Sequence, residues 1–171
     1  MGLWATIAAD AAAESPLWRD ALLSERDEEP VFSTLADERY ALGLETIYEG
    51  YLVHYGRPRL FAPTDEDAAL LLGDYLYAHG LVRVAALDDV AAVADLAELI
   101  SICAQLRADA MGGDGAAWAA SAALLGTGAL DAVREALRLR GDPSPLVDAA
   151  RAAAGDEAVA RALDLHLQRV G

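Results

Sequence analysis

The stretch Leu70–Gly80 restricts the fold of this chain more than any other, because it is apolar on almost every side of a helix. Thr64–Asp67 precedes it as a typical helix start, with Thr64 as the cap, so we expect a helix that runs to about Ala86. A helix that is apolar around its whole circumference is normally surrounded by other elements. We therefore expect this helix to be the central one, with Leu72 and Leu76 buried.

One carboxylate interrupts this stretch, at Asp74, directly after Gly73. A buried carboxylate without a partner costs several kcal/mol, so we expect Asp74 to have one, from Arg57, Arg59 or His54. The interpretation that we favour is a hydrogen-bonded aspartate beside a glycine that contacts another helix.

The rest of the chain predicts an all-α fold, a single-domain helical bundle over residues 1–171. Alanine, the best helix former, is abundant, and only Val82–Val84 could form a short strand. Breaks are expected at Ser24–Pro30, Gly56–Arg59 and Gly112–Gly115. The expected helices are Leu3–Ala13, a short one from Pro16, Ser33–Tyr55, Thr64–Ala86, Val90–Met111, Ala116–Leu125, Leu130–Leu139, Pro145–Ala153 and Glu157–Val170. Central helices would cover about 33–111, and alanine-rich C-terminal helices about 116–170.

The charge of the chain excludes several kinds of partner. Its formal net charge is −15, and every basic residue other than histidine is arginine. Such a chain repels nucleic acid and anionic lipid, so neither is expected as a partner. No long uninterrupted apolar segment and no signal peptide is visible, which favours a cytoplasmic protein without membrane insertion. Cys103 is the only cysteine, and its apolar neighbours favour a packing role.

Five segments occur in the order that they have in a known family. They are Tyr51–His54, Gly56–Arg59, Leu72–Leu76, Leu87–Val93 and Ala97–Ala104. In this order they resemble the end of a helix, an arginine-containing loop, a Gly-Asp helix and a following helix of the all-α trans-prenyl diphosphate synthases. The resemblance covers about a third of the chain and implies the helical fold of isoprenoid synthases.

The same comparison argues against catalysis. The family holds Mg²⁺ and a diphosphate between two DDxxD motifs. In place of the first motif this chain has Tyr55-Gly56-Arg57. The second motif is matched by neither Asp156-Glu157 nor Asp164. Ionisation of an allylic diphosphate needs Mg²⁺ bound to such carboxylates. We therefore expect no bound metal or cofactor and no catalytic residue.

The resemblance instead implies a non-catalytic accessory subunit, similar to the small subunit of a two-component polyprenyl diphosphate synthase, whose partner is the catalytic synthase. The alternative is an unrelated all-α interaction or scaffold protein of an oligomeric assembly. The positive mean hydropathy favours association in either case, with a partner protein or as a homo-oligomer.

Four residues are candidates for contact with a diphosphate or a partner: Arg57, Arg59, His54 and Asp74. Two arginines beside a proline could hold a diphosphate, as arginines in this loop do in the catalytic relatives. The acidic helix start nearby disfavours an anion, so we favour an intramolecular salt bridge. The histidines lack the spacing of metal ligands, and His166 is expected to be exposed.

Overall fold

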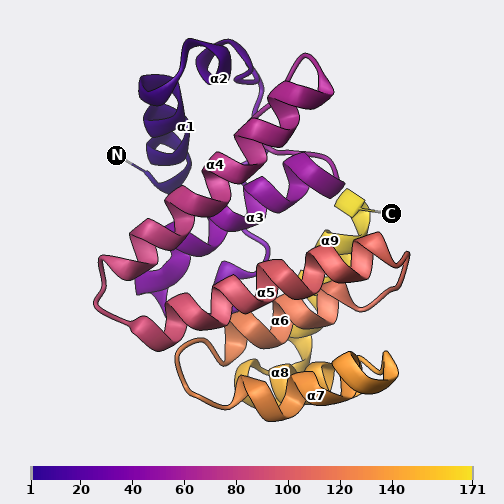
Figure 1. Ribbon diagram of the computed structural model, residues 1–171. Helices are drawn as coiled ribbons and strands as arrows, with labels where there is room; N and C mark the ends of the chain where they lie inside the picture. Colours follow the sequence, from indigo (N-terminus) through magenta and orange to yellow (C-terminus); the bar gives the residue numbers. More distant parts are fainter. Residues whose placement is uncertain (1, 171) are drawn as a thin grey trace.

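The computed structural model describes residues 2–170, and within this range the chain is all-α (Figure 1). It contains no strand there, only an isolated antiparallel bridge between Leu22 and Phe61. The helices are α1 (Leu3–Glu14), α2 (Pro16–Asp20), α3 (Ala41–Tyr55), α4 (Glu66–Ala85), α5 (Val90–Ala108), α6 (Asp114–Ala123), α7 (Leu130–Arg140), α8 (Ser144–Ala154) and α9 (Asp156–Val170). The expected all-α class is confirmed, and Val82–Val84, considered as a strand, is helical.

Four glycines let α3 and α4 pack closely and antiparallel. Gly43 and Gly50 lie two turns apart on α3, and Gly73 and Gly80 lie two turns apart on α4. A Cβ at Gly50 would stand 2.9 Å from the carbonyl oxygen of Gly73, and one at Gly80 would stand 3.0 Å from that of Gly43. Side chains larger than hydrogen would separate the two helices.

The central helix is α3, not α4. Every residue of α3 from 43 to 52 is buried. Helix α4 buries Leu72 and Leu76, as expected, but Leu70 and Leu71 face solvent. The prediction of a central α4 is wrong. An apolar side of a helix is not always covered within the monomer, and here the side that carries Leu70 and Leu71 is left exposed.

The segment before α3 is not the continuous helix expected from Ser33. Two 3₁₀ turns, Ser33–Leu35 and Glu38–Tyr40, replace its first two turns. The side chain of Glu45 accepts hydrogen bonds from the backbone N–H groups of Val31 and Ser33, both at 3.2 Å. These carboxylate contacts hold the chain in tight turns and satisfy N–H groups outside a helix.

Other helix ends differ from expectation by a few residues. Asp65, not Thr64, caps α4, because its carboxylate accepts from the backbone N–H of Ala68 at 2.8 Å. Helix α5 ends at Ala108 instead of Met111, and Ala110 beyond it has a φ of 53°.

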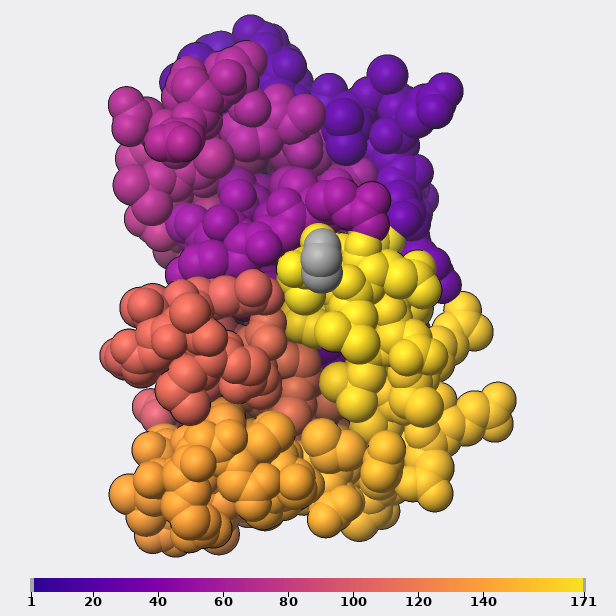
Figure 2. Space-filling view, turned by 90° about the vertical axis from the view of Figure 1, so that its right-hand side faces the viewer, coloured from indigo at the N-terminus to yellow at the C-terminus, as the bar shows by residue number. Residues whose placement is uncertain are grey.

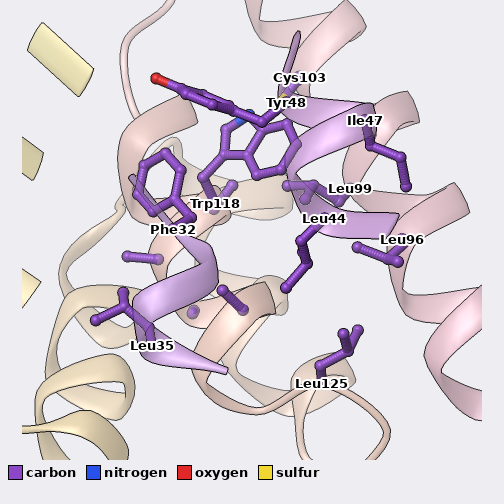
Figure 3. Close-up of a cluster of buried hydrophobic side chains, with 14 of the residues drawn as sticks. Phe32, Leu35, Leu44, Ile47, Tyr48, Leu96, Leu99, Cys103, Trp118 and Leu125 are labelled. Atoms are coloured by element: carbon purple, nitrogen blue, oxygen red, sulfur yellow. The ribbon is translucent and has the colours of Figure 1, made fainter. Parts of the chain in front are cut away.

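The largest group of buried side chains lies between α3, α5 and α6. Figure 3 shows Trp118 of α6 beside Phe32 and Tyr48, with ring centroids 5.6 and 5.0 Å away, respectively. Cys103 is buried in the same cluster, which confirms its packing role. Figure 2 shows the C-terminal segment, α9, lying against the segment that contains α3. Helix α3 therefore contacts both halves of the chain.

Candidate functional site

Helix α3 carries two buried glutamates, which form a cluster with Arg59 in the loop after the helix. Glu45 and Glu49 lie one turn apart, so they share a face of the helix. The Arg59 guanidinium, 1% exposed, donates to Glu45 Oε2 at 2.6 Å and to Glu49 Oε2 at 3.0 Å. Burial opposes its charge, but the two carboxylates outweigh burial and raise the pKa of Arg59. The intramolecular salt bridge expected for this residue is confirmed.

The remaining oxygens of this cluster are also occupied. Glu49 Oε1 accepts from the backbone N–H groups of Arg59 and Leu60, at 2.8 and 2.7 Å. Glu45 Oε1 accepts hydrogen bonds from the backbone N–H and the hydroxyl of Ser33. The Arg59 guanidinium lies 4.5 Å from the ring centroid of Trp4. The cluster connects α3 to the turn around Ser33, to the loop at Arg59 and, through Trp4, to α1. The guanidinium of Arg59 is fully engaged by these contacts, so it is not free to bind a diphosphate.

A second, partly buried network joins α3, α5, α6 and α9. Asp114 Oδ2 accepts from Arg107 at 2.7 Å, from His166 Nε2 at 3.1 Å and from the hydroxyl of Tyr51. The other ring nitrogen, His166 Nδ1, lies 2.9 Å from the hydroxyl of Tyr48. Because a carboxylate only accepts, Nε2 carries a proton, and in a neutral ring Nδ1 accepts from Tyr48. The expectation that His166 is exposed is wrong.

The electrostatics of this network favour the ionised aspartate. Burial raises the pKa of Asp114, but hydrogen bonds from His166 and Tyr51 and the charge of Arg107 outweigh it, so the pKa lies below its ordinary value. Burial and the bond to Asp114 raise the pKa of Tyr51. A Tyr–His–Asp arrangement can relay protons in enzymes. Here His166 and Tyr48 are each 1% exposed, so a solute in water does not reach the imidazole.

Asp74 lies on the surface, contrary to the expectation of a buried carboxylate. Its side chain is 66% exposed, and its Oδ1 stands 3.3 Å from His54 Nε2. His54 covers Gly73, where a Cβ would come within 2.3 Å of the ring. Burial lowers the pKa of His54, although Asp74 opposes this shift. Of the three expected partners, the structure brings only His54 to Asp74.

Arg57 is exposed and bonded to the end of α9. Its side chain donates a hydrogen bond to the carbonyl oxygen of Gln168. Its backbone N–H donates to the carbonyl oxygen of Arg169 at 2.9 Å. A polar cavity of about 340 Å³ beside it is lined by Asp27, Glu29, Arg57, Pro58, Leu165, Gln168 and Arg169. Asp27 already pairs with Arg169. Its two carboxylates balance its two arginines, so the cavity offers no excess of positive charge to a diphosphate.

Helix α1 is joined to α4 by a half-exposed polar group. Asp10 Oδ2 accepts from Arg83 at 2.6 Å and lies 3.4 Å from His79 Nε2. Arg83 also donates to the hydroxyl of Thr46 on α3. Burial raises the pKa of Asp10, but the bonds from Arg83 and His79 outweigh it and lower the pKa. Arg83 is therefore engaged inside the chain.

Sequence reasoning missed Glu45, Glu49 and Asp114. For the two glutamates a signal existed, since carboxylates one turn apart in an apolar helix need a shared partner. For Asp114 there was none, because its partners lie on three other helices.

Over residues 2–170 no group of three or more histidine, cysteine, aspartate or glutamate side chains is arranged to hold a metal ion. Within the same residues, no helix combines the length and apolarity that crossing a membrane requires. No family model, curated protein or solved structure matches the chain.

Proposed function

We propose that this chain is a non-catalytic helical subunit, similar in fold to the isoprenoid synthases, that binds a catalytic prenyl diphosphate synthase. The observation that carries the proposal is a second apolar side on α4, opposite the side that packs on α3. We define the α4 stripe as Leu70, Leu71, Ala78 and Val82, all of which are exposed.

The members of the α4 stripe lie on one side of the helix. At 3.6 residues per turn, its members fall within an arc of roughly 120°. The exposed fractions of Leu70, Leu71 and Val82 are 55%, 59% and 63%. Apolar side chains gathered on one surface of a protein commonly mark a site of protein–protein contact. A partner that covered this stripe would give α4 the central position that its sequence predicts.

The two principal landmarks of the resemblance are in contact. His54, at the end of α3, lies against Gly73 and Asp74 of α4. Two helices that carry family landmarks are therefore immediate neighbours, which supports an isoprenoid-synthase-like arrangement.

The region in which the family has its first DDxxD motif supports a non-catalytic role. After His54 the chain turns at Gly56, where a Cβ would stand 2.9 Å from the carbonyl oxygen of Arg169. The last turn of α9 thus packs where α3 ends. Arg57 is bonded to this turn, and Arg59 is held by two glutamates.

Affinity purification of the tagged full chain from its native host tests the proposal. We expect a trans-prenyl diphosphate synthase to be recovered with the wild type and lost with the Leu71→Asp/Val82→Asp double variant. Leu139→Asp is the matched control, because Leu139 is 70% exposed but lies on α7. Recovery of the synthase with the double variant would contradict the role of the α4 stripe.

An enzyme assay tests the catalytic part separately. We expect the purified chain to form no elongated prenyl diphosphate with Mg²⁺, and to alter product length when added to the recovered synthase. Elongation by the chain alone would contradict a non-catalytic role. Recovery of a partner from another class of protein would favour the alternative, an unrelated all-α interaction or scaffold protein.

A further inference from the structure

Between Leu70 and Val82, one carboxylate lies on the same side of the helix as the α4 stripe. Asp74 falls on the helix between the directions of Leu70 and Ala78, inside the same arc of roughly 120°. Its side chain is 66% exposed, so a protein that covers the stripe must also cover this carboxylate.

Within residues 2–170, no arginine forms a salt bridge with Asp74. Its contact is His54, at 3.3 Å, and burial lowers the pKa of that imidazole, which favours the neutral ring at neutral pH. Arg83, on another side of α4, is engaged by Asp10 at 2.6 Å. A positive group from the other protein would therefore compensate the burial of Asp74 in an interface most fully.

Building on the proposed function, we propose that the α4 stripe binds an apolar helix of a different protein that presents an arginine or lysine to Asp74, and that it does not pair with a second copy of itself. Pairing of two α4 stripes would bury two carboxylates without a cation, and each costs several kcal/mol. Two copies, each with a formal net charge of −15, also repel one another.

Sedimentation of charge variants of the full chain tests this. We expect the wild type and Asp148→Asn to remain monomeric at micromolar concentration, and Asp74→Asn to self-associate at least about tenfold more tightly. Asp148→Asn is the matched control, because it removes the same charge from an exposed position on α8. Equal association of the wild type and Asp74→Asn would overturn the proposal.

A charge-swapped mixture supplies the basic group directly. We expect the wild type and Asp74→Arg to form a mixed dimer at least about tenfold tighter than either chain forms alone. Adding Leu71→Asp to either chain should abolish this dimer. A mixture no tighter than the separate chains, or a dimer insensitive to Leu71→Asp, would overturn the proposal.

These measurements use only this chain and remain decisive whichever partner the host supplies. Recovery of a protein other than a prenyl synthase would contradict the proposed function but not the role of Asp74. Equal association of all variants would contradict the role of Asp74 even where a synthase is recovered.

Discussion

Replacing Arg59 by methionine should destabilise the chain more than any other change to an arginine. The guanidinium is fully buried and makes hydrogen bonds to two carboxylates and to the carbonyl oxygens of Glu29 and Glu45. Removal of one partner from a buried ion pair typically costs about 3–5 kcal/mol. The free energy of unfolding of an ordinary domain is about 5–15 kcal/mol, so we expect Arg59→Met to lose at least about a fifth of it.

Urea unfolding followed by circular dichroism measures this loss. Arg57→Met is the matched control, because Arg57 lies two residues away and is exposed, and we expect it to cost about 1 kcal/mol or less. Arg59→Lys keeps the positive charge, but a lysine ammonium cannot reproduce the planar guanidinium that bonds both glutamates. We therefore expect its loss of free energy of unfolding to be intermediate. Similar losses for Arg59→Met and Arg57→Met would refute the argument.

Three further predictions concern the other clusters and the helix pair. The pKa of Asp114 is depressed in the folded chain, so its stabilising effect is present above the ordinary aspartate pKa of about 3.9 and is lost as the pH falls below it. Acid titration of Asp114→Asn should therefore show a weaker loss of stability in that range than the wild type. Gly80→Ala should lower the free energy of unfolding by about 1–3 kcal/mol through overpacking against α3, whereas Gly112→Ala, with open space around it, should not. By NMR, the His54 ring should titrate below the ordinary histidine value of about 6.5, and titration at or above it would contradict its burial.

Local patterns in the sequence were sufficient to predict most helices. Glycine, proline and acidic caps mark the ends of α4, α5 and α8 to within a few residues, because these signals act through nearby backbone groups. The start of α3 was wrong for a related reason. Its upstream N–H groups are satisfied by Glu45, a side chain more than ten residues further along the chain.

The candidate site was less predictable, because its contacts join residues far apart in sequence. The prediction that Arg59 forms an intramolecular salt bridge is confirmed. The sequence did not indicate that its partners are Glu45 and Glu49 of α3. Nothing near His166 in the sequence distinguishes it from an exposed histidine of the last helix. Only the fold shows that Asp114 and Tyr48 meet its two ring nitrogens.

The Gly73-Asp74 pair separates the two sides of α4. Consecutive residues on a helix point about 100° apart, so Gly73 faces α3 while Asp74 faces solvent. The glycine permits close packing against His54, and the carboxylate marks the side that the monomer leaves open. The chain itself covers one apolar side of α4, with α3. We propose that the second side is covered by a protein that supplies a positive charge to Asp74.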